Sequence, residues 1–497
     1  MMNQGQTLER LEAGMPVITA GGQVLRVTEA LAARFQPGDS LAVVAHSGEL
    51  LCIPAAEKQI ATAAVTQCVN AFQAMGSVSD EQISSFYEAF AGALADDAIW
   101  LQIAAVNVQD VADARARGRS TTRLVATEKL RNGMIDGLRG WIQAPSRRGQ
   151  ILETVQQDGF RVELVGAALG VVAFVFEGRP NVLADACGVL RGGNTVVFRI
   201  GSDALRTAQA IMRLAVAPAI TAAGLPAGAV TLVESAAHAA GWALFSDERL
   251  ALAVARGSGS AVATLGSLAR SVGVPVSLHG TGGAWIVAAE SADAERFGRA
   301  VVNSLDRKVC NTLNTCCILA SEATRLVPVL LESLAEAGRR RDQSFKLHVA
   351  EGSAHVVPAA LFQKIVAIRR AAGDVDEPQA ELLPTHALGH EWEWEETPEI
   401  TLVTVESMAE AVALFNQYSP QFVGSLISNE EAEHQRFYET INAPFVGNDY
   451  TRWVDGQFAL HKPELGLSNW QHGRLFGRGA ILSGDSVYTV RTRFIRE

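Results

Sequence analysis

A cysteine in a basic, polar loop is the residue of this sequence best suited to act as a nucleophile. Residues 303–315 read N-S-L-D-R-K-V-C-N-T-L-N-T, with Cys310 near the centre. Arg307 and Lys308 lie just before the thiol, and the apolar run 316–320 follows it, which predicts a loop entering a buried strand. Nearby cations and backbone N–H groups lower the pKa of a thiol and favour the reactive thiolate. The alternative for Cys310, taken alone, is a small core residue, because free cysteines are often buried.

Size and composition narrow the classes of function. A chain of 497 residues is longer than the length at which a single hydrophobic core stops growing, so at least two domains are expected. A net charge of -11, with scattered positive charges, argues against nucleic acid or an acidic membrane surface as a partner. The six cysteines have neither zinc-like nor disulfide-framework spacing, which predicts a reducing, cytoplasmic location. We also expect no secretory signal and no membrane span, since the longest uncharged run, 214–233, is interrupted by Pro and Gly.

The elements that must position the cysteine loop follow from the spacing of apolar residues. Residues 1–58 alternate short apolar runs with turn residues, which predicts an N-terminal β-rich accessory domain. Helical patterns fill most of 59–143. A hairpin is expected within 146–165, turning at Asp158-Gly159 and typical of an oligomerisation arm, and the alternating residues 486–495 are expected to form a strand that pairs with it.

Strand and helix patterns then alternate, which predicts an α/β protein with open parallel sheets. The run 166–176 is apolar without alternation, as in a strand buried on both faces. Further strands are expected at 195–198, 230–233, 250–255, 274–277, 285–289 and 315–319. Ligands of such sheets lie beyond the carboxyl ends of the strands, so the loops that follow strands are the candidates for binding.

Three such loops begin with an arginine. Residues 179–181 also contain Asn, and residues 199–202 and 256–260 also contain Gly and Ser. The two that combine Gly, Ser and Arg would let backbone N–H groups and a planar cation approach phosphates, although a plain turn is the alternative for each. The chain has no G-x-G-x-x-G opening a helix and no P-loop. Any nucleotide must therefore be held in another way.

Five groups of residues, taken in order, resemble the motifs of the γ-glutamyl phosphate reductase (glutamate-5-semialdehyde dehydrogenase) family, within the aldehyde dehydrogenase superfamily. They are residues 177–182 with Asp185, residues 193–199 with Gly201, residues 224–226, Asn303 with residues 309–312, and Asn448 with residues 451–453, 455–456, 458 and 464–468. The resemblance covers roughly residues 60–490 and leaves residues 1–58 without a counterpart.

The resemblance implies an aldehyde dehydrogenase-like fold. A Rossmann-like, nicotinamide-binding domain would span 59–276 and carry the hairpin, a catalytic α/β domain would span 277–475, and residues 476–497 would form a C-terminal arm. The β arm implies a homodimer or homotetramer.

The resemblance also implies roles for individual positions. Cys310 falls on the nucleophile, and Asn181 on the amide that forms an oxyanion hole with the Cys310 N–H. The substrate-binding positions are Arg179, Asn311 and Arg452. The cofactor-binding positions, along the riboses, adenine and pyrophosphate, are Arg199, Gly201, Ser202, Pro226, Arg256, Gly257, Ser258 and Glu396. No metal is expected.

The implied reaction is the reduction of a small-molecule acyl phosphate, γ-glutamyl phosphate above all, to an aldehyde through a thioester on Cys310. Because Arg199 could face a 2′-phosphate and no acidic residue claims the ribose 2′-OH in its segment, we expect NADP, with NAD as the alternative.

Several positions depart from the family pattern. Leu278 occupies the place of the glutamate that activates water in hydrolytic aldehyde dehydrogenases, so the thioester should be spared hydrolysis. His279 could act as a base, but a structural role is the simpler interpretation. Asn314 replaces a glutamate, Trp285 introduces an indole, and the approach to Cys310 is about two residues shorter than the family's, which together predict an altered pocket. A different acyl phosphate, thioester or aldehyde substrate, or an inactive nucleotide-binding paralogue, therefore remains an alternative.

Overall fold

The structure, a computed structural model, divides into two compact units. Unit 1 comprises residues 1–280, 462–467 and 481–497, and unit 2 comprises residues 281–461 and 468–480. The residues described are 8–19, 22–44, 47–119, 121, 124–176, 178–370, 373–454, 459–471, 474–475 and 480–497. The chain therefore crosses between the units near the boundary predicted at 276, and it returns to unit 1 twice near its end.

Unit 1 is built on a five-stranded parallel sheet of order β11-β10-β7-β8-β9. The strands are β7 (Val171–Phe176), β8 (Thr195–Ile200), β9 (Val230–Leu232), β10 (Leu250–Arg256) and β11 (Val276–His279). Every residue of β7 and β8 is buried, as the apolar runs predicted. The helices are α2 (Ala55–Met75), α3 (Asp80–Ala95), α4 (Asp97–Ala116), α5 (Glu128–Gln143), α6 (Val182–Ala186), α7 (Leu205–Ile211), α8 (Ala217–Ala222), α9 (His238–Phe245) and α10 (Gly259–Ser271).

The long helices begin where side-chain caps predict. Ser79 and Gln82 form a reciprocal capping box at the start of α3, and Asp96 caps α4. No single helix among the described residues is long and apolar enough to cross a membrane, and α3 and α4 pass that test only as a pair bent by 72°.

The N-terminal segment consists of two antiparallel pairs, β1 (Pro16–Ile18) with β2 (Val24–Arg26) and β3 (Ser40–Val44) with β4 (Glu49–Ile53), around the short helix α1 (Glu29–Arg34). Its β-rich character is as predicted, and a small apolar cluster joins its elements. It is grouped with unit 1, however, because β3 and β4 also pack on α10 and α9.

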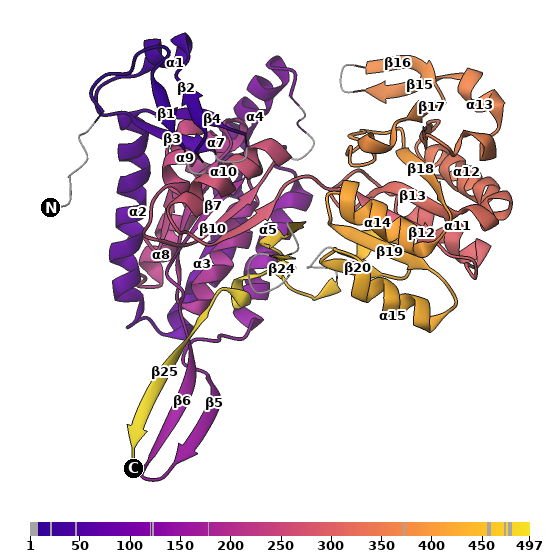
Figure 1. Ribbon diagram of the computed structural model, residues 1–497. Helices are drawn as coiled ribbons and strands as arrows, with labels where there is room; N and C mark the ends of the chain where they lie inside the picture. The colour runs from indigo at the N-terminus through magenta and orange to yellow at the C-terminus, as the bar shows by residue number, and fades with distance from the viewer. Residues whose placement is uncertain are drawn as a thin grey trace. The chain divides into compact units, whose positions relative to one another are not determined.

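A three-stranded antiparallel arm belongs to unit 1 (Figure 1). Its strands are β5 (Ile151–Gln157), β6 (Phe160–Ala167) and β25 (Thr489–Arg496), in the order β25-β6-β5. Gly159, at φ 77°, makes the turn between β5 and β6. The predicted pairing of the last strand with the hairpin is therefore confirmed, with Thr489 opposite Ala167 and Arg496 opposite Phe160.

Unit 2 is built on a seven-stranded parallel sheet of order β17-β14-β18-β13-β12-β19-β20. The strands are β12 (Ala284–Ala288), β13 (Leu313–Leu319), β14 (Lys346–Ala350), β17 (Ala380–Leu383), β18 (Glu399–Val405), β19 (Val423–Ile427) and β20 (Phe445–Gly447). The hairpin β15 (Ile365–Arg370) and β16 (Gly373–Pro378) is antiparallel, as are the short pairs β21 (Gly466–Leu467) with β24 (Ile481–Leu482) in unit 1 and β22 (Trp470–Gln471) with β23 (Arg474–Leu475) in unit 2.

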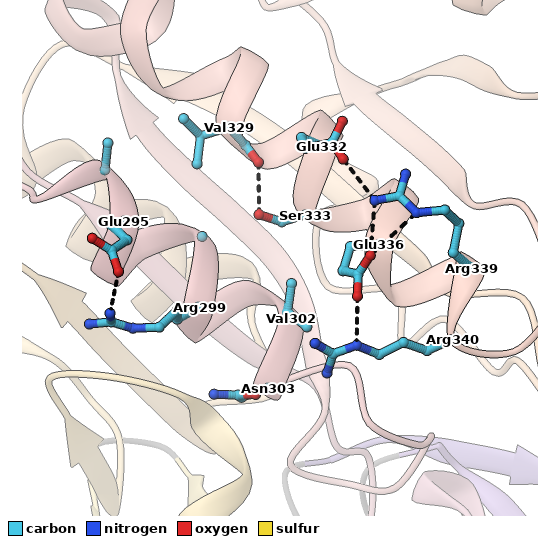
Figure 2. A pocket seen from close by; sticks show the side chains of 12 residues that line it. Glu295, Arg299, Val302, Asn303, Val329, Glu332, Ser333, Glu336, Arg339 and Arg340 are labelled. Carbon is cyan, nitrogen blue, oxygen red and sulfur yellow. Dashed lines mark hydrogen bonds and ion pairs between the residues drawn. The ribbon is translucent and has the colours of Figure 1, made fainter.

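The helices of unit 2 are α11 (Ala294–Asn303), α12 (Ala323–Arg339), α13 (Ala359–Gln363), α14 (Met408–Tyr418) and α15 (Glu431–Thr440). α11 and α12 lie against each other and leave a shallow groove rimmed by intrahelical ion pairs such as Glu295–Arg299 and Glu336–Arg340 (Figure 2). α11 ends at the first residue of the cysteine loop, so the packing of this helix fixes where the loop starts.

Candidate active site

Cys310 lies in the loop that joins α11 to β13. The Thr312 hydroxyl closes this loop, since Oγ1 donates to Arg307 O at 2.6 Å and accepts from Val309 N at 2.9 Å. Cys310 is partly exposed, whereas the other five cysteines are buried. Burial raises the pKa of the Cys316 and Cys317 thiols, which suits core residues and not nucleophiles. Exposure thus agrees with the assignment of the reactive thiol to Cys310.

A buried ion pair supports the loop from outside. Lys308 Nζ lies 2.5 Å from Glu391 Oε1, and the other oxygen of Glu391 accepts the Gly282 N–H at 2.5 Å. The Gly283 N–H in turn donates to Cys310 O at 2.7 Å. A Cβ on Gly282 would lie within 2.5 Å of Cys310 Cα, so only glycine permits this approach. The Cys310 backbone is therefore held against the first residues of unit 2.

Two predicted substrate-binding residues, Asn311 and Arg452, contact each other. Arg452 Nη1 donates to Asn311 Oδ1, and Arg452 Nε donates to Asp306 Oδ1 at 2.6 Å. The neighbouring Thr451 donates through Oγ1 to Asn311 O at 2.7 Å. Arg452 therefore binds both sides of the cysteine loop.

The departures from the family pattern have structural explanations. The Asn314 amide donates to His390 O at 2.8 Å and accepts from Trp392 N at 2.9 Å, a pairing that a carboxylate could not make because it has no donor. Trp285 is fully buried and packs edge-on against Phe415, with ring centroids 5.5 Å apart. The inference that Trp285 reshapes a pocket is therefore wrong, since its indole fills the hydrophobic core.

Leu278 and His279 end the last strand of the sheet in unit 1. Leu278 is 2% exposed and packs against Gly266 of α10. His279 is likewise buried, and its carbonyl accepts the Gly257 N–H at 3.3 Å. The structure thus shows a buried leucine at position 278, and its match to the water-activating glutamate of hydrolytic relatives stays a prediction.

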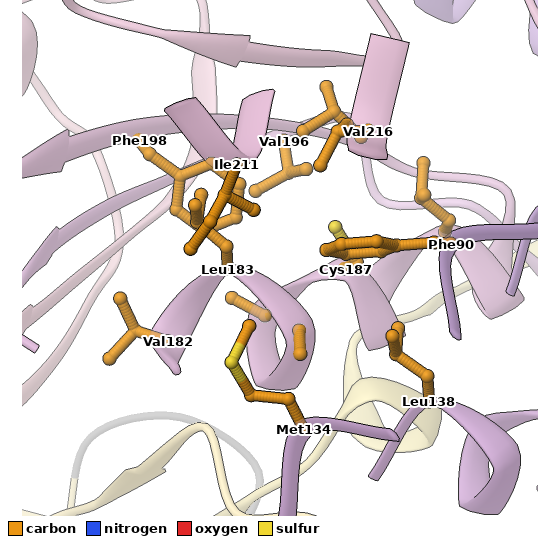
Figure 3. Close-up of a cluster of buried hydrophobic side chains, with 14 of the residues drawn as sticks. Phe90, Met134, Leu138, Val182, Leu183, Cys187, Val196, Phe198, Ile211 and Val216 are labelled. Atoms are coloured by element: carbon orange, nitrogen blue, oxygen red, sulfur yellow. The ribbon is translucent and has the colours of Figure 1, made fainter. Parts of the chain in front are cut away.

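In unit 1, the order of the sheet changes direction between β7 and β10, and ligands of open α/β sheets bind at such switch points. The chain proceeds from β7 to β8 and β9 on one side, and then to β10 and β11 on the other. At the carboxyl ends of β7 and β10, the two strands at this switch point, lie Arg179 and Asn181 in the loop after β7, and Arg256 as the last residue of β10. The core beneath α6 anchors the loop after β7, because Val182 and Leu183 pack among Met134, Phe198 and Ile211 (Figure 3).

A polar cluster lies at these strand ends. Asn181 Nδ2 donates to Asp185 Oδ2 at 3.0 Å, and Arg256 Nη1 lies 2.9 Å from Glu464 Oε1. Burial raises the pKa of Asp185 to about 7; Arg256 opposes this rise and Glu464 adds to it. Arg256, predicted to bind the cofactor, is thus paired within unit 1.

Three more predicted cofactor residues lie at the end of β8 and directly after it. Arg199 is buried and donates through Nη2 to the carbonyls of Ala236 and Ala237, at 3.0 and 3.1 Å. Burial lowers the pKa of Arg199 and the Glu57 carboxylate on α2 opposes this. Gly201 N donates to Phe176 O at 3.1 Å, and Ser202 Oγ accepts from Arg119 at 3.5 Å.

The other predicted cofactor residues occupy turns and a helix start. Pro226 precedes β9 and accepts the Ala229 N–H at 3.0 Å. Gly257 and Ser258 lead into the 13-residue helix α10, and Ser258, at its N-cap, makes no side-chain capping bond. The first N–H groups of a helix attract anions, and the role of Gly257 and Ser258 at a pyrophosphate stays a prediction.

Glu396 lies on an exposed bend before β18 and has no partner among the described residues. The carboxylates that reach the cysteine loop, through Lys308, are those of Glu391 and Glu393 instead. The role assigned to Glu396 on the nicotinamide ribose stays a prediction. In the described ranges, no group of three or more His, Cys, Asp or Glu side chains could hold a metal ion.

Comparison with known proteins places the chain in a family. Residues 40–344 match the profile of the aldehyde dehydrogenase family. The chain belongs to this family. Members of this family use a nicotinamide cofactor. The parallel sheets of this aldehyde dehydrogenase family member agree with the family fold.

Curated relatives of this aldehyde dehydrogenase family member are γ-glutamyl phosphate reductases. The enzyme of Xanthomonas axonopodis pv. citri is 33% identical over 278 residues, 54% of this chain and 66% of that relative, or just under two thirds of its length. The enzyme of Afipia carboxidovorans is 28% identical over 391 residues, 76% of this chain and 83% of that relative. The crystal structure of γ-glutamyl phosphate reductase from Thermotoga maritima aligns with a TM-score of 0.75 at 22% identity, covering 88% of this chain and 98% of that one, which supports the fold.

Sequence reasoning missed three charged residues at these sites. Glu391 lies 83 residues after Lys308, Glu464 lies 208 residues after Arg256, and Glu57 lies 142 residues before Arg199 (391 − 308, 464 − 256 and 199 − 57). No local pattern links residues so far apart. The only available signal was that a predicted cation needs a carboxylate as its partner. The sequence contains many carboxylates, and this signal does not distinguish among them.

Proposed function

We propose that this protein reduces γ-glutamyl phosphate to glutamate-5-semialdehyde with NADPH. The observation that carries the proposal is the partly exposed Cys310, in a loop held by Lys308, Glu391 and Arg452. The relatives named γ-glutamyl phosphate reductase support the choice of substrate.

The reaction proceeds through a thioester on the Cys310 sulfur, which is formed in the first step and broken in the last. The Cys310 thiolate attacks the acyl carbon, the bond from that carbon to the phosphate oxygen breaks, and inorganic phosphate leaves as the thioester forms. When bound, the nicotinamide supplies a hydride to the thioester carbon. The carbon–sulfur bond then breaks, releasing the aldehyde and regenerating the thiolate. Leu278 offers no base for a competing hydrolysis.

In this proposal, residues of unit 1 bind the cofactor, and one of them donates a hydrogen bond to the substrate. The N–H groups at the start of α10, with Gly257 and Ser258, hold the pyrophosphate. Arg199 supports NADP over NAD because its guanidinium would pair with a 2′-phosphate. The Asn181 side-chain amide donates to the oxygen that becomes negative during attack on the acyl carbon.

The reverse reaction tests this function. Purified protein is incubated with glutamate-5-semialdehyde, NADP and phosphate, and NADPH formation is followed for wild type, Cys310→Ala and Cys316→Ala. We expect turnover that depends on phosphate, is abolished in Cys310→Ala and is retained in the Cys316→Ala control. Turnover that survives in Cys310→Ala would refute the mechanism. Turnover with another aldehyde, but none with this one, would assign a different acyl substrate.

We further propose that the arm mediates self-association into a dimer or tetramer. Its exposed apolar side chains support this: Ile151, Leu152, Val155, Val490 and Phe494. Sedimentation velocity of wild type and Phe494→Glu tests it, because a species of unchanged, monomeric mass in both would contradict it. A cytoplasmic location is proposed from the six free thiols, and cell fractionation tests that assignment.

A further inference from the structure

The Asn181 amide is held by a carboxylate one helical turn further along the chain. Asn181 directly precedes α6, and its Nδ2 donates to Asp185 Oδ2 at 3.0 Å. An ionised carboxylate can only accept hydrogen bonds, so this contact selects the amide orientation in which nitrogen, and not oxygen, faces Asp185. The same contact fixes the plane of the amide and the direction of its second N–H.

Charged groups from three segments face Asp185. Arg256 ends β10, Glu464 lies in the segment that returns to unit 1, and Arg179 follows β7. Burial raises the pKa of Asp185 to about 7, Arg256 lowers it, Glu464 raises it, and the Asn181 hydrogen bond and Arg179 lower it. The charge of Asp185 therefore changes near neutral pH. A protonated carboxyl group can donate its O–H, which favours the amide oxygen as its partner instead of the amide nitrogen.

We propose that Asp185 is a positioning residue, whose charged carboxylate orients the Asn181 amide so that an N–H is presented to the substrate oxyanion. This inference rests on the proposed function, in which Asn181 donates to that oxygen. With Asp185 neutral, the amide can turn its oxygen toward the oxyanion, which repels it. Removal of one oxyanion donor typically lowers kcat by about 10²- to 10³-fold, and this sets the upper limit for loss of its orientation.

The experiment measures kcat from pH 5.5 to 9 with glutamate-5-semialdehyde, NADP and phosphate, for wild type, Asp185→Asn and Asp185→Ala. Wild-type kcat should rise as Asp185 ionises. Asp185→Ala, which has no acceptor, should lose about 10- to 100-fold in kcat at pH 8 and lack this rise. Asp185→Asn, whose neutral amide can face either way, should lie between the two and also lack the rise.

Three controls separate orientation from a structural defect. Asp136→Asn makes the same charge change on the exposed face of α5 and should keep the wild-type profile. The pH dependence of Cys310 alkylation by iodoacetamide reports the thiol itself and should be the same in wild type and both Asp185 variants. The Kd for NADP should also be unchanged in these variants, which shows that unit 1 is folded.

A double-mutant comparison gives the deciding result. If Asp185 acts through Asn181, Asp185→Ala should cause no further loss of kcat in an Asn181→Ala background. A full additional loss there, or a wild-type pH profile in Asp185→Asn, would overturn the inference. If Cys310→Ala is inactive, these outcomes contradict only the role of Asp185 and leave the proposed function intact. Persistent turnover in Cys310→Ala would instead refute the function on which the inference rests.

Discussion

Glu391 joins Lys308 to Gly282 through its two carboxylate oxygens, each at 2.5 Å from the nitrogen that it contacts. The Lys308 and Glu391 side chains are only 8% and 14% exposed. Since Lys308 lies two residues before Cys310 and Gly282 packs on the Cys310 backbone, one carboxylate links both flanks of the thiol. Glu391 is therefore a structural support of the nucleophile, separate in sequence from the loop that it holds.

Removing one partner of the Lys308–Glu391 ion pair should lower the free energy of unfolding more than removing both partners. Glu391→Ala leaves the Lys308 ammonium with only the exposed Glu393 carboxylate, 4.0 Å away, and we expect a loss of up to about 3 kcal/mol in the free energy of unfolding. The double variant Lys308→Met/Glu391→Ala should be more stable than Glu391→Ala, and the single variant Lys308→Met completes the cycle. Urea unfolding measures both. An additive cycle, without coupling between positions 308 and 391, would contradict the ion pair.

Gly282 should tolerate no side chain. A Cβ at this position would come within 2.5 Å of Cys310 Cα, and the atoms that it would meet first belong to the Cys310 backbone, which cannot shift easily. We expect Gly282→Ala to lower kcat by at least about 10-fold and to cost about 1–3 kcal/mol of stability, as overpacking does.

Gly133→Ala is the matched control, because a Cβ at this exposed position of α5 would meet no atom within 4 Å. Alanine is a better helix former than glycine, so this variant should gain up to about 1 kcal/mol and keep its activity. Equal kinetics for Gly282→Ala and Gly133→Ala would show that the close approach to Cys310 is unimportant.

Arg199 should set the preference between the two nicotinamide cofactors. Its guanidinium is anchored by two backbone carbonyls, and loss of a charged partner for a phosphate typically costs about 1.5–3 kcal/mol. Arg199→Gln should therefore raise the KM for NADP by about 10- to 100-fold, with a much smaller change for NAD. Glu57→Gln, which removes the opposing carboxylate, should not raise the KM for NADP. Equal losses with both cofactors in Arg199→Gln would contradict this role.

The sequence predicted most of the fold because its patterns are local. Uninterrupted apolar residues marked β7, Asp158-Gly159 marked the hairpin turn, and alternation marked β25. The boundary of the N-terminal segment was not predictable in this way. Whether a β-rich stretch packs on itself or on α9 and α10 depends on tertiary contacts, and here it does both.

The candidate site was predictable only where chemistry and local motif coincide. Cys310 and Asn311 could be found from the loop, but the partners Glu391 and Glu464 come from distant segments. Trp285 shows the opposite limit. In a strand covered on both faces, apolar content does not reveal whether an indole faces a pocket or the core, and the contact with Phe415 decides for the core.

Glu377 should make the stability of unit 2 depend on pH in the acidic range. Arg370 binds both Glu377 oxygens, at 2.8 and 2.7 Å, and this pairing lowers the Glu377 pKa from 4.5 to about 2 despite an opposing effect of burial. A depressed pKa means that the unfolded chain takes up the proton first, so the stabilisation is complete above pH 4.5 and is lost as pH falls toward 2. Glu377→Gln should cost up to about 3 kcal/mol at pH 7 and clearly less at pH 3, whereas the exposed control Asp376→Asn should differ little from wild type at either pH. Urea unfolding at both values measures this, and an equal cost of Glu377→Gln at pH 3 and pH 7 would contradict the linkage.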